Sequence, residues 1–212
     1  MYGGEHRSWH ETFAAELQEL GVEAFGLEVD LSDPNAVLPL METIRERAGT
    51  LSILVNNAAF STNGDIDELT AQQLDDHFAV NVRGMALLTQ AFVRQWNGSS
   101  GGRVVNMTSG QGQGPMPGEL AYAASKGAVE AFTTSVAPTL AARGITINAV
   151  NPGPTDTGWM SDKLKAILLP QFPMGRIGGP EDAARLVAFL CSNEAEWITG
   201  QVMNSEGGFW RR

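Results

Sequence analysis

The sequence predicts an α/β fold built on a parallel sheet, and two observations lead to this prediction. Short apolar runs alternate along the chain with longer segments whose apolar residues recur at helical spacing. The run at residues 51–55 is apolar apart from one serine, as expected for a strand that is buried on both faces. A chain of 212 residues with 43% hydrophobic and 18% charged residues suits a single domain with a sizeable core.

Local signals indicate where the elements begin and end. Pro34 suits the first position of a helix, and Thr70 with Gln73 forms a capping-box pattern. Pro138 lies inside a helical segment and is expected to kink it. We predict strands over residues 24–29, 51–55, 104–109, 145–150 and 198–203, and helices over residues 8–21, 34–48, 70–96, 122–142 and 180–191.

Polar residues follow the predicted strands. Asp30, Asn56, Asn57, Ser109 and the run from Asn151 to Gly153 all come at or directly after a strand. In open parallel sheets, ligands bind at the carboxyl ends of the strands. The shared position of these residues therefore predicts a binding site at that edge of the sheet.

One pair of residues indicates the chemistry of that site. Tyr122 and Lys126 lie four residues apart on a predicted helix, so one face of the helix carries both side chains. A tyrosine has a pKa of about 10, and a neighbouring ammonium lowers it by favouring the phenolate. Ser109 is placed to hydrogen-bond the same substrate oxygen. These side chains suit proton transfer to a carbonyl or from an alcohol, although the pair alone also fits a helix-start aromatic and a solvated lysine.

Composition excludes several other classes of protein. The net charge of −10 argues against a nucleic acid or an anionic membrane as partner, and no apolar run is long enough to span a bilayer. Cys191 is the single cysteine, which fits a cytoplasmic location. His6, His10 and His77 show no ligand spacing, so we expect them at the surface and expect no metal site.

These motifs resemble those of the short-chain dehydrogenase/reductase family, and most closely those of its 3-oxoacyl-carrier-protein reductase group. The similarity runs in order from about residue 12 to the end of the chain. It implies one Rossmann-like, doubly wound domain over residues 1–212. The motifs are Asp30-Leu-Ser-Asp, Asn56-Asn-Ala-Ala, Val80-Asn-Val, Ser109, Tyr122-x-x-x-Lys126, Asn151-Pro-Gly and Ile198-Thr-Gly-Gln.

The resemblance implies an NAD- or NADP-dependent oxidoreductase that interconverts a carbonyl and a secondary alcohol. Tyr122 would be the general acid/base, Lys126 would lower its pKa and hold the nicotinamide ribose, and Ser109 would orient the substrate carbonyl. Asn81 would anchor a water in a proton relay. The implied cofactor contacts, besides Tyr122 and Lys126, are Asp30 and Leu31 at the adenine, Asn57, Ala58 and Ala59 along the channel, and Pro152, Gly153, Thr155 and Thr157 near the nicotinamide and pyrophosphate.

Other readings of these residues stay open at this point. Asn81 also suits a local hydrogen bond within a helix, Asp30 a helix-approach cap, and Gly153 a turn between two prolines. A catalytically silent family member, acting as a subunit or binding partner, is an alternative for the whole chain. A serine hydrolase using Ser109 is excluded, because Met107 and Gln111 replace the glycines that it needs.

The family's initial strand, glycine-rich phosphate loop, helix and second strand have no counterpart in these 212 residues. The run from Gly110 to Gly114 is no substitute, because Pro115 follows it instead of a helix start. We therefore expect an N-terminally truncated sheet, with residues 24–29 either isolated at a gap or shifted beside residues 51–55. We also expect NAD or NADP to bind weakly or not at all, and no residue here indicates which of the two is preferred.

Two apolar surfaces indicate partners. The helices predicted over residues 70–96 and 122–142 are apolar on more than one face, which favours a homodimer or homotetramer. The segment 159–172 reads either as a lid over an apolar, small-molecule carbonyl substrate or as core. Its apolar residues include Trp159, Met160, Leu164, Ile167, Leu168 and Phe172.

Overall fold

The computed structural model describes residues 6–210, and the chain divides into two compact units, Met1–Asp30 and Leu31–Arg212. In the first unit, helix α1 (His6–Glu19) is followed by Gly21, which has a φ of 82°. The side-chain amide of Gln18 then donates to the carbonyl of Ala24 over 3.0 Å. Residues 22–30 form neither helix nor strand. The prediction of a strand over residues 24–29 is therefore wrong.

The error at residues 24–29 has a physical reason. A strand needs a neighbour that accepts and donates its backbone hydrogen bonds, and a face that becomes buried. Within residues 6–210, the sheet contains four strands and this segment is not one of them. The side chains of Phe25 and Leu27 are exposed. The apolar pattern predicted a strand, but a pattern cannot supply the pairing strand.

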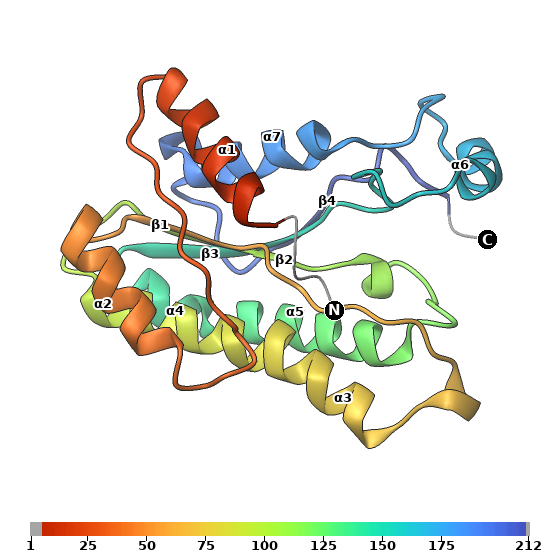
Figure 1. Ribbon diagram of the computed structural model, residues 1–212, viewed down its shortest axis with the longest axis horizontal. Helices are drawn as coiled ribbons and strands as arrows, with labels where there is room; N and C mark the ends of the chain where they lie inside the picture. Colours follow the sequence, from red (N-terminus) through yellow and green to blue (C-terminus); the bar gives the residue numbers. More distant parts are fainter. Residues whose placement is uncertain (1–5, 211–212) are drawn as a thin grey trace. The chain divides into compact units, whose positions relative to one another are not determined.

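The second unit is organised around a parallel sheet in the order β1-β2-β3-β4 (Figure 1). The strands are β1 (Ile53–Asn56), β2 (Gly102–Met107), β3 (Ile145–Asn151) and β4 (Val202–Asn204). Asn56 lies beside Asn106, and Met107 lies beside Val150. The strands therefore end together, and the polar residues that follow them share one edge of the sheet, as the sequence predicted.

Helices cover both faces of this sheet. On one face lie α2 (Val37–Ala48), α4 (Met85–Gln95) and α5 (Leu120–Ala141), and on the other lies α7 (Pro180–Cys191) (Figure 1). The remaining helices are α3 (Ala71–Phe78) and α6 (Asp162–Leu168), with short turns η1 (Ile66–Glu68), η2 (Ala79–Gly84), η3 (Gly110–Gly112), η4 (Leu169–Gln171) and η5 (Asn193–Ala195). None of the helices within residues 6–210 is both long and apolar enough to cross a bilayer.

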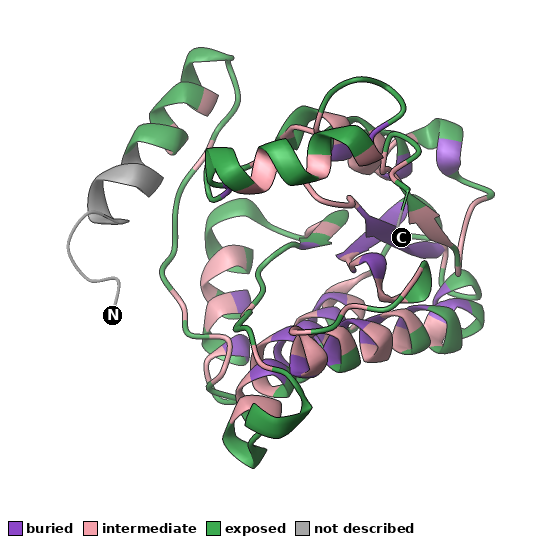
Figure 2. Cartoon of the chain, turned by 90° about the vertical axis from the view of Figure 1, so that its right-hand side faces the viewer, coloured by how far each residue is buried: buried purple, intermediate pink, exposed green. Residues whose placement is uncertain are grey.

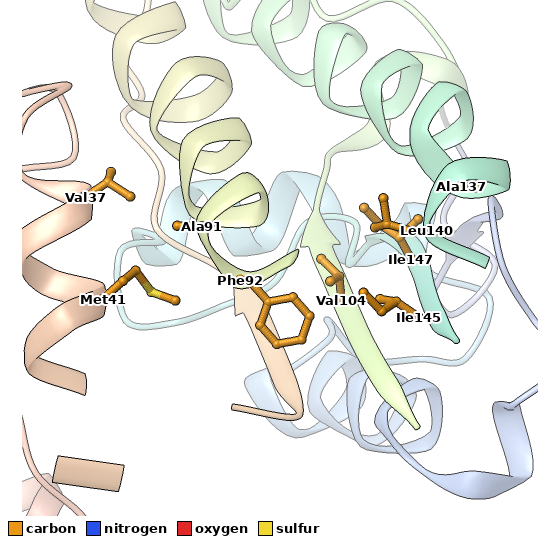
Figure 3. Close-up of a cluster of buried hydrophobic side chains, with 9 residues drawn as sticks. All are labelled: Val37, Met41, Ala91, Phe92, Val104, Ala137, Leu140, Ile145 and Ile147. Atoms are coloured by element: carbon orange, nitrogen blue, oxygen red, sulfur yellow. The ribbon is translucent and has the colours of Figure 1, made fainter. Parts of the chain in front are cut away.

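The core follows from the alternation of side chains along the strands. Val104 and Ile147 pack with Phe92 on the face covered by α2, α4 and α5 (Figure 3). The next residue, Val105, packs with Leu190 of α7 on the opposite face. The central strands β2 and β3 are accordingly buried, while the outer surfaces of the helices are exposed (Figure 2). Ile53 and Val55 of β1 are exposed, so the prediction that this strand is buried on both faces is wrong, because β1 lies at the edge of the four-stranded sheet.

The helix predicted over residues 70–96 is interrupted. Its start is confirmed, because Thr70 and Gln73 form a complete capping box. However, η2 is a π-helical turn that separates α3 from α4. Its last residue, Gly84, lies against the chain at Leu31, where an added Cβ would come within 2.8 Å of the Leu31 carbonyl oxygen. The sequence pattern did not predict this turn, because π and α turns place apolar residues on similar faces over so short a distance.

The C-terminal third also differs in detail. The strand predicted over residues 198–203 is shorter and later, because Gly200 adopts a φ of 70° and donates its N–H to the Ile147 carbonyl over 2.7 Å. In the segment 159–172, Met160 and Phe172 are buried as core, whereas Trp159 is exposed. The reading of this segment as core therefore holds for Met160 and Phe172, and the lid stays a prediction.

Candidate active site

Three of the predicted site residues come together at the end of β2. Ser109 follows the strand, and its hydroxyl lies near enough to the phenol of Tyr122 to lower the pKa of that phenol. Lys126 lies one turn further along α5, with its ammonium nitrogen 5.6 Å from the centre of the Tyr122 ring. Its Nζ donates to the carbonyl oxygen of Met107 over 2.7 Å. This arrangement agrees with the prediction that Tyr122 and Lys126 share one helix face at the end of this strand.

Burial dominates the electrostatics of the lysine. The Lys126 side chain is 3% exposed, and loss of hydration lowers the pKa of its ammonium to about 8. The carbonyl oxygen of Met107, which accepts a hydrogen bond from this ammonium, replaces part of the hydration that burial removes. A buried cation of this kind attracts electron-rich groups such as hydroxyl oxygens.

The pKa of Tyr122 differs from our expectation. Burial raises the pKa of the phenol above its ordinary value, the hydrogen bond from Ser109 lowers it, and the nearby carboxyl of Glu119 raises it. Desolvation is the largest of these influences, so the net shift is upward and not downward as the sequence suggested. In this state the phenol keeps its proton at neutral pH and is suited to donate it.

Asn81 is fixed by the segment that follows β1. Its side-chain oxygen accepts from the N–H of Phe60 over 2.7 Å, and its amide nitrogen donates to the Phe60 carbonyl over 2.9 Å. The same nitrogen donates to the hydroxyl of Ser125, which donates to the Tyr122 carbonyl over 2.8 Å. Asn81 therefore links η2, the segment after β1 and the first turn of α5.

The residues predicted along the cofactor channel follow β1 and β3. Asn57, Ala58 and Ala59 are exposed directly after β1. After β3, Gly153 has a φ of 66° and donates its N–H to the side-chain oxygen of Asn151 over 2.9 Å. This left-handed backbone conformation is by itself a reason for a glycine at position 153, with no ligand contact required.

The remaining predicted contacts are divided. The hydroxyl of Thr155 donates within its own loop to the carbonyls of Pro152 and Gly153, and Thr157 is exposed. Asp30 is the exposed last residue of the first unit. Leu31 begins the second unit, where it packs on Gly84.

Two residues near the site were missed or misplaced by the sequence analysis. Glu119 precedes α5 and acts on the charge of Tyr122. His77 was expected at the surface, and that prediction is wrong, because its side chain is 0% exposed. The side chains of His6 and His10 lie outside the described residues. The spacing of His77 and Asn81, four residues apart, was the available signal that both face the same neighbours.

Comparison with known proteins agrees with this architecture. A family model described as enoyl-(acyl carrier protein) reductase matches residues 4–210. The uncharacterized oxidoreductase YjdA of Bacillus subtilis is 53% identical over 206 residues, covering 96% of this chain and 82% of that protein. The 3-oxoacyl-[acyl-carrier-protein] reductase FabG of Staphylococcus aureus is 34% identical over 203 residues, covering 94% of this chain and 82% of that protein.

A solved structure shows the same fold. The landomycin C-6 ketoreductase LanV, crystallised with NADP and rabelomycin, superposes with a TM-score of 0.83 at 33% identity, covering 93% of this chain and 80% of that one. The matched family model spans all of the described residues, and both protein relatives exceed 30% identity. The chain therefore belongs to the short-chain dehydrogenase/reductase family of oxidoreductases.

Proposed function

We propose that this chain is an NAD- or NADP-dependent carbonyl reductase that acts on largely apolar ketones and uses Asn81, Ser109, Tyr122 and Lys126. The observation that carries the proposal is the neighbouring pair of hydroxyls, Ser109 and Tyr122, at the carboxyl end of β2 with the buried ammonium of Lys126 beside them. Two hydroxyls of this kind can hold one carbonyl oxygen between them. LanV is named a ketoreductase and FabG a 3-oxoacyl-[acyl-carrier-protein] reductase, and both names describe reduction of a carbonyl.

The side chains at this edge fit a nicotinamide dinucleotide. An ammonium has three hydrogens, and Met107 accepts one of those on Lys126. The others suit the hydroxyls of a ribose. Ala58 and Ala59 are small and exposed beside the site, so they leave room for a flat ring. When bound, the dinucleotide supplies the hydride for reduction of a carbonyl.

Tyr122 and Ser109 divide the remaining work. The raised pKa of Tyr122 keeps its phenol protonated at neutral pH, so it can give a proton to the carbonyl oxygen as that oxygen gains charge. Ser109 donates to the same oxygen and orients the carbonyl. Asn81 acts through the backbone of α5, because its amide reaches Tyr122 by way of Ser125.

Substrate preference tests the proposal directly. We expect kcat/KM for NADPH- or NADH-dependent reduction to rise with the apolar length of a ketone, because Trp159 and Ile167 offer exposed apolar surface after β3. Each methylene that is buried on binding contributes about 0.8 kcal/mol, or roughly a fourfold increase. The measurement is the decrease of nicotinamide absorbance with a matched series of short polar and longer 3-oxoacyl or aromatic ketones. A preference for the polar members would contradict the apolar assignment, and no turnover with any member would contradict the reductase.

We propose further that the protein is a homodimer or homotetramer joined through α4 and α5. A hollow of about 450 Å³ lies between these helices, and Leu87, Val93, Phe132 and Val136 contribute apolar surface to it. These side chains are only partly buried, although they pack against the core. Apolar surface of this kind is typical of an interface.

Light scattering at micromolar concentration should therefore give at least twice the mass of one chain. Val93→Glu should shift the protein to a monomer, because it places a charge in the interface. Ile66→Glu, at an exposed position of η1, is the matched control and should leave the mass unchanged. A monomeric parent protein would contradict this assembly.

A further inference from the structure

His77 is a fully buried polar side chain near the reacting hydroxyls. Its Nδ1 lies 2.6 Å from the carbonyl oxygen of Gln73, and its Nε2 accepts from the N–H of Thr62 over 3.1 Å. A carbonyl only accepts and a backbone N–H only donates. These partners therefore assign the proton to Nδ1 and require a neutral imidazole. The ring is satisfied on both sides and has no hydrogen-bonding capacity left for a ligand.

The partner of His77 belongs to a segment that is held at three points between β1 and α5. Phe60 is held through both its N–H and its carbonyl by Asn81. Thr62 is held by His77. Gly64 donates to the carbonyl of Gly118 over 2.7 Å, two residues before α5 begins. Because Asn57 to Ala59 lead into this segment, its position also determines where the candidate channel runs.

The His77 ring also reaches the reacting residue itself. Its centre lies 6.3 Å from that of the Tyr122 ring at an interplanar angle of 68°, and 5.0 Å from that of Phe60 at 72°. Both contacts are edge-to-face, an arrangement that aromatic rings favour. His77 thus lies between the held segment and the ring that carries the phenol. Helices α3 and α5 are in contact around it (Figure 1).

We propose that His77 is a positioning residue for the reaction. It fixes Thr62 against α3 and supports the Tyr122 ring, so that the phenol stays on the Ser109 hydroxyl. The inference rests on the proposed reductase activity for its kinetic consequence, but the pinning of residues 60–64 stands on the contacts alone. The side chains of His77 and Asn81, four residues apart, both hold this segment, at Thr62 and at Phe60.

Two substitutions separate the hydrogen bonds of the ring from its bulk. His77→Phe keeps an aromatic ring against Phe60 and Tyr122 but leaves the Thr62 N–H without an acceptor. His77→Gln keeps an acceptor near the Nε2 position and loses the ring shape. Thr133→Val is the matched control, because it removes a buried hydrogen bond to Asn106 two turns beyond Lys126 without touching residues 60–64.

For the kinetic test, we expect His77→Phe to lower kcat about tenfold, equivalent to about 1.4 kcal/mol in the barrier. The dissociation constant for NADPH should change less than twofold, since Tyr122 is the predicted dinucleotide contact that the ring touches, and phenylalanine keeps an aromatic ring against it. His77→Gln should restore kcat to within about threefold of the parent. Thr133→Val should lower the melting temperature and keep kcat. A His77→Phe variant with parental kcat, or an equal loss of kcat in Thr133→Val, would overturn the positioning role.

A second measurement decides the pinning even if the protein shows no turnover. Hydrogen exchange followed by mass spectrometry should show faster exchange at residues 60–64 in His77→Phe, and unchanged exchange there in Thr133→Val. Unaltered exchange in His77→Phe would refute the pinning whatever the activity. Absence of turnover in the parent, combined with faster exchange in His77→Phe, would refute the reductase proposal and leave the structural role of His77 standing.

Discussion

Replacing Tyr122 by phenylalanine should lower kcat by about 10²–10⁴-fold, the range that a positioned general acid contributes. The substitution removes one oxygen atom and keeps the ring, so the edge-to-face contact with His77 is retained. What is lost is the proton donor and the hydrogen-bond partner of Ser109. The affinity for the dinucleotide should stay within about twofold, because the predicted ribose contact belongs mainly to Lys126.

Steady-state kinetics and calorimetric titration with NADPH and NADH measure these two effects separately. Tyr2→Phe, at the other tyrosine of the chain, is the matched control and should retain the parental rate. Activity of Tyr122→Phe within tenfold of the parent would remove the tyrosine from the role of general acid. A rate loss accompanied by an equal loss of dinucleotide affinity would instead indicate that the phenol serves binding.

Replacing Lys126 by methionine should damage both rate and dinucleotide affinity, while making the apo protein more stable. Methionine keeps most of the apolar stem and removes the ammonium, so the ribose contact and the charge near the Tyr122 ring disappear together. The stability gain follows from burial. Burial lowers the pKa of Lys126 from 10.5 to about 8, a difference equivalent to about 3 kcal/mol.

The sign of this effect fixes its pH window. Between pH 8 and 10.5 the unfolded chain holds the lysine proton more tightly than the folded one, so the free energy of unfolding rises with pH through that interval. Below pH 8 both states are protonated and the folded state bears the full penalty. Denaturant titrations of the parent should therefore show stability increasing by about 3 kcal/mol across this window relative to Lys126→Met.

Lys163→Met provides the control, since Lys163 is exposed on α6. Its unfolding free energy should follow the parental pH dependence. An identical pH dependence in the parent and in Lys126→Met would show that the ammonium is better hydrated than its 3% exposure indicates. Retained dinucleotide affinity in Lys126→Met would remove the ribose contact from the proposal.

Much of the architecture was determined by local sequence. The apolar run of β1, the capping box at Thr70 and the helix that carries Tyr122 and Lys126 all depend on neighbours within a few residues. Such patterns act through backbone geometry, so they hold wherever the segment is placed. The common edge of the site followed in turn, because parallel strands end together.

The tertiary structure alone decided whatever depends on distant partners. Residues 24–29 form no strand because strand formation needs a paired neighbour, and the same kind of apolar pattern became β1 only beside β2. His77 is buried because Thr62 and Gln73 satisfy both of its ring nitrogens. Composition cannot reveal such a pairing, since the partners are set by how α3 meets the segment after β1.

The direction of the Tyr122 pKa shift shows the same division. The sequence determined which groups stand near the phenol: a lysine one turn away, a serine at a strand end and a glutamate before the helix. Their balance depends on how much water each retains, and packing determines that. Desolvation outweighs the Ser109 hydrogen bond, so the pKa rises. Residue identity thus specified the acid, and burial decided that it holds its proton at neutral pH.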